Sequence, residues 1–378
     1  MFVTIIIFLV VLSLLVFVHE FGHFFAARRL GVRAEEFGFG FPPRLWGMYK
    51  NKEGKWKRVW GRKEITDSQD TVYSINAIPL GGFVKIKGEN GDGKEDKDSF
   101  VSKKPWRRAI ILSAGVFMNI VLASVLISIG LMIGFPQSIN KDVLPKSAKI
   151  SNEKVQVVQI VPDSPAVEAG LEPADVLLSI NGEAVLDAND VEKIINSSDK
   201  EELTVIVSRF GEIRETSLIP KLLEEENRKI IGVAISQTAI VQYPWYSAIW
   251  EGLKMTGQLL WAIIYAFYEI IRNLIISQPI NAEVAGPIGI AELTGQMARM
   301  GIIYLIQFTA LLSLNLAIIN FLPFPALDGG RLIFLLIEKI KGRPVKKEVE
   351  AVFHNLGFML LMVLVLWVTI KDVVRLFN

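Results

Sequence analysis

The sequence predicts a polytopic α-helical membrane protein with about four transmembrane helices, a β-hairpin region at the membrane edge and one small α+β domain outside the cytoplasm. Three observations lead to this fold class. The 378 residues are 51% hydrophobic with a mean hydropathy of +0.39, which is high for a soluble protein and low for a chain buried entirely in a bilayer. Four apolar runs are long enough to span. A stretch of mixed polarity with short β-rich runs separates the second run from the third.

The composition excludes several kinds of site. The chain has no cysteine, which rules out disulfides, thiolate zinc sites and cysteine nucleophiles. It has only three histidines, His19, His23 and His354, which are too few for the histidine-rich diiron site of membrane desaturases. The net charge of +2 gives no reason to expect a nucleic-acid partner.

The first apolar run, in residues 1–30, ends with two imidazoles and a carboxylate in the motif His19-Glu20-Phe21-Gly22-His23. Residues four apart lie on one face of a helix, so His19 and His23 can bind one metal ion, with Glu20 placed to act on a metal-bound water. Zinc lowers the pKa of such a water to about 7. Charged groups inside a span cost about 2.5–3.5 kcal/mol on insertion scales, so the motif indicates a functional site. The alternative is a helix end whose polar residues meet the lipid headgroups.

Basic residues set the expected orientation of this span. Arg28, Arg29 and Arg33 follow it directly, which by the positive-inside rule places the N-terminus outside and the motif toward the cytoplasm. No lysine or arginine precedes the run, so we interpret it as a retained span and not as a signal peptide. The second span, residues 109–135, follows another basic cluster, crosses outward and carries one conspicuous polar residue, Asn119.

Residues 31–108 are expected to form β-hairpins and a basic loop on the cytoplasmic side. Aromatic residues and glycines alternate at period two in Phe37–Phe41, and Pro79–Val84 lies in another short strand pair with a glycine turn. A hairpin that dips into the membrane edge and a plain surface hairpin fit the first pattern equally. A basic insert from about Met48 to Ser68 has no role that the sequence identifies.

Residues 136–226 change character and predict a compact α+β domain, which the topology places outside. A helix is expected over Asn189–Asn196, and the Asn181-Gly182 pair marks a tight turn. The alternative is a passive spacer. The expected strands are Val155–Val161, Asp175–Ile180, Leu203–Arg209 and Ile213–Pro220.

Residues 227–300 contain an aromatic-rich stretch, Tyr243–Ser277, which is long enough to span but is interrupted by four charged residues. We expect one or two amphipathic helices on the outer membrane surface, followed by a loop. A true span here would place the basic tract in residues 339–350 outside, against the positive-inside rule.

The third span and its continuation, residues 301–338, carry a second polar cluster. Asn320 stands at the inner end of the apolar run, and prolines break the helix before Leu327–Gly330. A carboxylate and non-helical backbone at membrane depth are tolerated where they line a buried or watery cavity. Asp328 is therefore the natural third metal ligand, which leaves a fourth position open for water. Asp328 as a helix N-cap is an alternative that is compatible with metal binding.

The chain ends with a basic loop, residues 339–350, and a fourth span, residues 351–371, which crosses outward. His354 lies at the inner end of this span. It is a weaker candidate for a ligand, because His19, His23 and Asp328 already fill the site.

The two polar clusters are expected at the same depth, where they form one catalytic centre. One Zn²⁺ per chain is held by the two histidines and the aspartate, and Glu20 acts as general base. Asn320 donates a hydrogen bond to the substrate backbone or to the developing oxyanion. A helix in the bilayer hides its amides, so a substrate must unwind, and an edge strand can hold it by strand addition. The strand residues expected to contact substrate are Gly38, Phe39, Gly40, Gly81 and Gly82.

In these motifs the chain resembles the site-2 proteases, which are intramembrane zinc metalloproteases, and most closely their bacterial RseP/RasP-like branch. The resemblance covers nearly the whole chain. It implies hydrolysis of peptide bonds within transmembrane segments, as in regulated intramembrane proteolysis, at the bacterial inner (cytoplasmic) membrane. The segments that carry it are His19–His23, Gly38–Gly40, Pro79–Lys85, Ala114–Asn119, Gly286–Ala291 and Asn320–Gly330.

The resemblance also implies the partners. The substrates would be single-span membrane proteins, such as anti-sigma factors already trimmed outside by an upstream site-1-type protease, or remnant signal peptides. Membrane lipid surrounds the protein, and no nucleic acid is expected.

The segment Val161–Gly182 closely resembles part of a PDZ domain, so residues 136–226 are identified as a single extracytoplasmic PDZ domain. Such domains bind extended peptides by strand addition. The domain lacks an obvious Gly-Leu-Gly-Phe carboxylate loop, and it is one domain where the best-known family member has two in tandem. The residues assigned to peptide binding are Val158, Gln159 and Ile160.

Two hypotheses from other classes compete with a protease. The first is a membrane-anchored PDZ scaffold with a vestigial metal site, and the intact Glu20 and the three intact ligands speak against it. The second is a metal transporter, which needs ligands on more helices and a continuous polar path. The polar residues here cluster at one depth.

Overall fold

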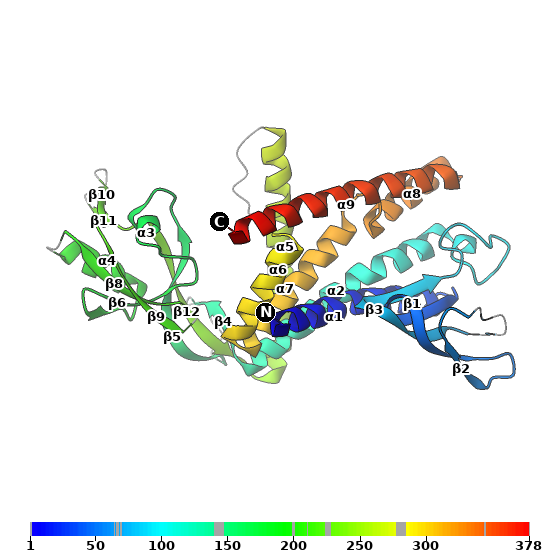
Figure 1. Ribbon diagram of the computed structural model, residues 1–378, viewed down its shortest axis with the longest axis horizontal. Coiled ribbons are helices and arrows are strands. Elements are labelled where there is room, and N and C mark those ends of the chain that lie inside the picture. Colours follow the sequence, from blue (N-terminus) through cyan, green and yellow to red (C-terminus); the bar gives the residue numbers. More distant parts are fainter. Residues whose placement is uncertain are drawn as a thin grey trace. The chain divides into compact units, whose positions relative to one another are not determined.

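The computed structural model describes residues 2–63, 65, 68, 70–139, 147–198, 201–209, 211–223, 228–276, 285–343 and 345–377 (Figure 1). In this part of the chain, five helices are long and apolar enough to cross a membrane by length and composition. They are α1 (Phe2–Arg29), α2 (Pro105–Ile133), α5 (Trp245–Ile275), α7 (Ile302–Phe321) and α9 (Lys347–Phe377). The chain divides into two compact units.

Helix α5 is one continuous helix of 31 residues, where the sequence predicted one or two amphipathic helices. It has the lowest mean hydropathy of the five candidate spans, 1.2 against 2.1 or more for the others. Its aromatic residues are widely exposed, as in an interfacial helix. A position of α5 on the membrane surface therefore stays a prediction.

The larger unit comprises Met1–Ile127, Leu253–Ala298 and Phe308–Asn378. Two glycines, Gly22 of α1 and Gly115 of α2, bring these helices into direct contact within it. A Cβ atom at Gly22 of α1 would lie 2.3 Å from the carbonyl oxygen of Ala114 on α2, so no larger residue fits. Small residues allow such close backbone approach, which is how helices associate in lipid. The unit also contains η1 (Phe100–Ser102), α6 (Pro287–Met300) and α8 (Asp328–Lys341).

A sheet beside α1 contains β1 (Ala34–Lys50), β2 (Trp56–Trp60) and β3 (Val72–Ile86), in the order β2-β1-β3. The first half of β1 pairs with β3 on both sides: Gly38 is opposite both Phe83 and Ser74. The predicted strand Gly38–Phe41 is therefore interior and has no free edge for a substrate. The second half of β3 is the outer strand, and among the described residues no strand pairs with its far side.

The outer half of β3 packs against α1. Ser13 of α1 donates its hydroxyl hydrogen to the carbonyl of Pro79 at 2.9 Å and accepts from the backbone N–H of Gly81 at 3.2 Å. A Cβ atom at Gly82 would lie 2.9 Å from the Cα of Phe17 and 3.2 Å from the Cβ of Glu20. The glycines of this strand therefore let its backbone approach the metal-binding motif closely.

The smaller unit comprises Ser128–Gly252 and Arg299–Gln307 and is built around a seven-stranded sheet. The strand order is β4-β12-β5-β6-β8-β9, with β7 beside β6, and the core is made of alternating valine, leucine and isoleucine side chains. Its elements are β4 (Phe135–Ser138), β5 (Lys149–Ile160), α3 (Pro165–Glu168), β6 (Val176–Ile180), β7 (Glu183–Ala184), α4 (Ala188–Ser197), β8 (Leu203–Arg209), β9 (Glu212–Leu218), β10 (Lys221–Leu223), β11 (Arg228–Ile230) and β12 (Val233–Gln242).

The four predicted strands and the helix of this unit correspond to β5, β6, β8, β9 and α4. Strand β12 was not predicted. It lies beyond residue 226, where the sequence placed the end of the domain, yet it pairs with β5 along most of its length.

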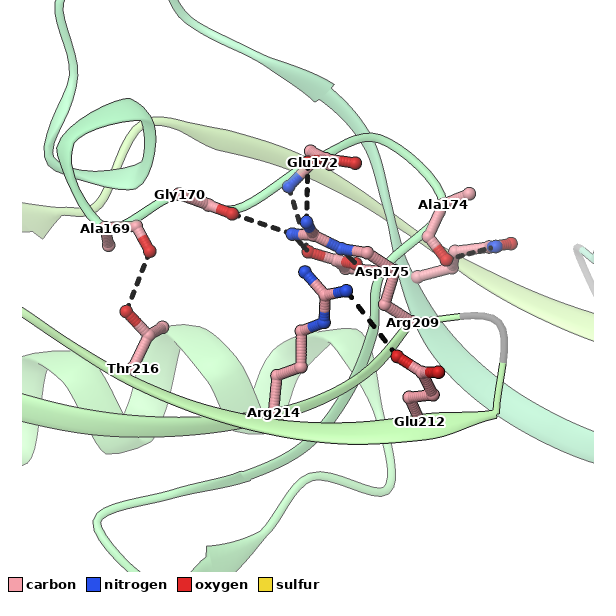
Figure 2. A network of polar contacts seen from close by, with 10 residues as sticks. Ala169, Gly170, Glu172, Ala174, Asp175, Arg209, Glu212, Arg214 and Thr216 are labelled. Carbon is pink, nitrogen blue, oxygen red and sulfur yellow. Dashed lines mark hydrogen bonds and ion pairs between the residues drawn. The ribbon is translucent and has the colours of Figure 1, made fainter. Parts of the chain in front are cut away.

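A buried ion pair joins β8 to the turn before β6 (Figure 2). Arg209 donates from Nε and Nη2 to the two carboxylate oxygens of Asp175 at 2.7 and 2.8 Å, and from Nη2 to the carbonyl of Gly170 at 2.7 Å. Asp175 is fully buried, and these hydrogen bonds raise the pKa of Arg209. Such a bidentate pair fixes the geometry of the turn, and Asp175 Oδ2 also accepts from the backbone N–H of Glu172 at 2.9 Å.

Candidate metal centre

Three side chains from two helices converge on one point in the larger unit. His19 and His23 lie on the same face of α1, and Asp328 is the first residue of α8. Asp328 Oδ2 is 3.1 Å from His19 Nε2 and 3.3 Å from His23 Nε2, and the two Nε2 atoms are 3.2 Å apart. A tetrahedral zinc with bonds of about 2.0–2.1 Å places its ligand atoms about 3.3 Å apart. The three atoms therefore fit one zinc ion.

The hydrogen bonds behind the imidazoles leave their Nε2 atoms free to bind metal. His23 Nδ1 lies 2.8 Å from the carbonyl of Ile111, which accepts only if the ring proton is on Nδ1. His19 Nδ1 lies 3.3 Å from the side-chain amide of Asn119. The fully buried amide oxygen of Asn119 has no hydrogen-bond partner among the described residues, and an amide turned to present that oxygen to His19 accepts from Nδ1–H. Such outer hydrogen bonds fix the tautomer of a metal-binding histidine.

Asn119 is thus a functional residue to which the sequence assigned no role. Its signal was present as the one conspicuous polar side chain of the second span. Ser313 of α7 holds it further by donating to its backbone carbonyl at 2.8 Å.

Helix α2 also touches the imidazoles directly through a glycine. A Cβ atom at Gly115 would lie 2.4 Å from His23 Nε2 and 2.7 Å from His19 Cε1. Only glycine leaves both rings where they stand, so this position shapes the site without contributing a ligand.

Glu20, His23 and Asp328 line a cavity of about 170 Å³, and Phe83 and Val84 of β3 also line it. The cavity brings the predicted general base, two of the predicted ligands and the outer strand together. Gly82 lies against Glu20, and Gly81 lies against Val16 of the same helix. The other predicted strand residues, Gly38, Phe39 and Gly40, lie one strand further away, where they support β3.

The polar end of α7 closes the site from another side. Asn320 Nδ2 is 3.4 Å from His19 Nε2, so the amide lies beside the metal-binding atoms. Asp328 is not a helix cap: the N-cap of α8 is Leu327, and the Asp328 carboxylate points to the histidines. His354 is not among the three grouped side chains; its Nδ1 accepts from the backbone N–H of Ala326 at 3.0 Å and so holds the turn before α8.

The residues predicted to bind peptide in the smaller unit pair along one side with a strand that was not predicted. Gln159 and Ile160 of β5 pair with Ala234 and Val233 of β12. Strand addition at Val158–Ile160 is therefore blocked on this side. The peptide-binding role of these residues stays a prediction, and the strand that pairs with them comes from outside the predicted domain.

Two histidines on the apolar helix α1 and an aspartate at the start of α8, at tetrahedral spacing and next to a glutamate, form the kind of site that metalloproteases use. The comparison with known families agrees. The model of Peptidase family M50 matches residues 7–60 and 62–364, so the chain belongs to this family, that of the site-2 proteases.

Several relatives cover nearly the whole chain. The regulator of sigma-W protease RasP of Bacillus subtilis is 31% identical, over 99% of this chain and 99% of its own length. Atu1380 of Agrobacterium fabrum, named as a zinc metalloprotease, is 31% identical over 97% of this chain and 94% of its own. Among solved structures, the PDZ domain of an SdrC-like protein from Listeria monocytogenes matches 23% of this chain and 92% of its own, with 17% identity and a TM-score of 0.21.

Proposed function

We propose that this protease uses one Zn²⁺ to hydrolyse peptide bonds inside the membrane segments of single-span proteins that another protease has already trimmed. The observation that carries the proposal is the tetrahedral spacing of His19 Nε2, His23 Nε2 and Asp328 Oδ2 beside Glu20. Anti-sigma factors and remnant signal peptides are the substrate classes. The name of the Bacillus subtilis relative, a regulator of sigma-W protease, supports the first class.

Each residue of the centre has a separate task. The two imidazoles and the Asp328 carboxylate hold the metal, which when bound lowers the pKa of a water and polarises the scissile carbonyl. Glu20 takes the proton of the attacking water and passes it to the leaving amine. The Asn320 amide donates a hydrogen bond to the substrate backbone or the oxyanion, for which its position beside His19 Nε2 is suited.

We propose that the substrate binds along the outer half of β3. A transmembrane helix must unwind to expose its peptide bond, and the freed backbone groups need partners in a medium without water. The strand from Gly82 to Ile86 offers such partners beside Glu20, by strand addition. Gly38, Phe39 and Gly40 contribute by holding this strand in place.

We place the protein in the bacterial cytoplasmic membrane with the metal centre toward the cytoplasm and the smaller unit outside. Arg28 and Arg29 end α1 near the centre, and Arg107 and Arg108 begin α2, which supports this orientation. We further propose that the smaller unit, as a PDZ domain, recognises the trimmed end of the substrate. Its peptide edge would be Val233–Ser236 of β12, because β4 begins to pair only at Thr238 and α4 contacts β12.

The test compares wild type with Glu20→Gln and His23→Ala, each purified in detergent, for zinc content and for cleavage of a model transmembrane helix. We expect about one zinc per chain in wild type and Glu20→Gln, with cleavage only in wild type, since the glutamate is a base and not a ligand. His23→Ala should lose zinc and cleavage together. A folded wild-type protein that holds no zinc, or a Glu20→Gln variant that still cleaves, would overturn the proposal.

A further inference from the structure

An ion pair lies directly beside the metal centre and has no part in the reaction described above. Glu89 follows the outer strand β3, and Arg331 lies one helical turn after the ligand Asp328 on α8. Arg331 Nη1 contacts Glu89 Oε1, and both side chains are about 30% exposed. The pair therefore joins the strand that we assign to the substrate to the helix that supplies the third ligand.

Glu89 stands at the boundary between two cavities. It lines the metal cavity of about 170 Å³ together with Glu20, His23 and Asp328. It also lines a neighbouring cavity of about 490 Å³, and Arg331 lines only this larger one. Glu89, a residue of the metal cavity, is thus held in an ion pair by a residue that lines only the larger cavity.

A free carboxylate in this cavity would compete with the reaction. Catalytic zinc sites have three protein ligands and keep the fourth position for water or substrate. Carboxylate oxygens bind zinc at about 2.0–2.2 Å, and a glutamate side chain is long enough to change its position by several ångströms. A Glu89 carboxylate released from Arg331 can take the fourth position and displace the water that attacks the peptide bond.

We propose that Arg331 is a positioning residue, which keeps Glu89 from becoming a fourth metal ligand. The inference rests on the zinc-dependent function proposed above. The proposal predicts opposite effects on cleavage and on metal binding. Loss of the arginine should lower cleavage and strengthen metal binding. A merely structural role of the pair would lower both.

The experiment uses the full-length protein and two readouts, cleavage of a model transmembrane helix and the half-time of zinc loss to an excess of chelator. Arg331→Gln should cleave at least about tenfold more slowly, because Glu89 occupies the position that the attacking water needs. Its half-time of zinc loss should be at least about tenfold longer than that of wild type, which corresponds to about 1.4 kcal/mol. The double variant Glu89→Gln/Arg331→Gln should regain cleavage relative to Arg331→Gln and lose zinc as fast as wild type. Arg331→Lys keeps a cation and should stay close to wild type in zinc loss.

A second ion pair provides the matched control. Arg108 donates two hydrogen bonds to Glu338 at 2.9 and 3.0 Å in the same larger cavity, but neither residue lines the metal cavity. Arg108→Gln should therefore not slow zinc loss, and Glu338→Gln should not rescue it.

The outcomes are distinct. Slower zinc loss in Arg331→Gln, reversed by Glu89→Gln, supports the inference. Faster zinc loss in Arg331→Gln, or no reversal in the double variant, overturns it. A wild-type protein that holds zinc but cleaves nothing overturns the proposed function alone, because the chelator experiment still decides the role of Arg331. A wild-type protein without zinc overturns both.

Discussion

Gly115 on α2 offers a sharp test of the metal centre, because the change adds one methyl group at a known distance from two ligands. In Gly115→Ala the new Cβ would stand 2.4 Å from His23 Nε2 and 2.7 Å from His19 Cε1. Non-bonded heavy atoms rest about 3.5–4.0 Å apart, so the imidazoles or α2 must shift by about 1 Å. Metal–ligand distances tolerate only about 0.2 Å.

The expected loss is a zinc affinity lowered by about 10- to 100-fold, which corresponds to about 1.4–2.8 kcal/mol. Competitive titration of zinc against a chelator measures it on the purified protein. Cleavage should fall in parallel at limiting zinc and recover in part when zinc is added in excess.

Gly257→Ala is the control. Gly257 lies in α5, and no atom outside the helix stands within 4 Å of the Cβ that alanine would add. Both changes raise helix propensity by about 1 kcal/mol, so a difference between them cannot come from the helix itself. If Gly115→Ala binds zinc as tightly as Gly257→Ala, the close contact between α2 and the imidazoles is wrong.

Three further predictions concern other parts of the chain. Asn119→Ala should lower zinc affinity by about 10-fold while Asn119→Asp, which keeps an acceptor for His19 Nδ1–H, should retain more of it in the same titration. Arg209→Met should destabilise the smaller unit by about 3–5 kcal/mol, because it leaves the charge of the buried Asp175 unpaired. The control Arg214→Met removes an exposed pair with Glu212 and should cost under about 1 kcal/mol. Resistance to proteolysis in increasing urea measures the stability of both variants. A hydrogen bond from Lys87 lowers the pKa of Asp98 below its unfolded value. The interaction therefore stabilises the loop after β3 at neutral pH, and this stabilisation is lost as the pH falls below about 4. Proteolysis of the loop should increase over this pH range in wild type and should not depend on pH in Asp98→Asn.

The metal ligands could be predicted from the sequence because their signals are local. His19 and His23 are one helical turn apart, and Asp328 stands in a proline-broken segment where a charge at membrane depth is costly. The spacing of the two histidines and the energetic cost of a charge inside an apolar run can both be read from short segments of the sequence, without knowledge of the fold. The structure adds their convergence, with 3.1–3.3 Å between the three atoms.

The sequence did not reveal which edges of the predicted strands are covered by other strands. The Gly38–Phe41 segment has the alternation of a strand, but alternation does not reveal whether its neighbours cover one edge or both. Here one long strand, β3, pairs with it twice. In the smaller unit, β12 lies in a segment that the sequence placed after the domain, and it pairs with one side of β5, the strand that carries the residues assigned to peptide binding. Pairing between distant segments is not encoded in either segment alone.

In the metal centre, the close packing of α1 against α2 also sets the orientation of the two imidazoles. Lipid tails are as apolar as leucine, so α1 and α2 gain little from burial and depend on the contact that Gly22 and Gly115 allow. The same contact brings Asn119 and the carbonyl of Ile111 against the Nδ1 atoms, which turns both Nε2 lone pairs toward Asp328. Helix packing and ligand orientation are therefore one structural feature: a change that separates α1 from α2 also removes the hydrogen bonds that prepare the histidines for metal.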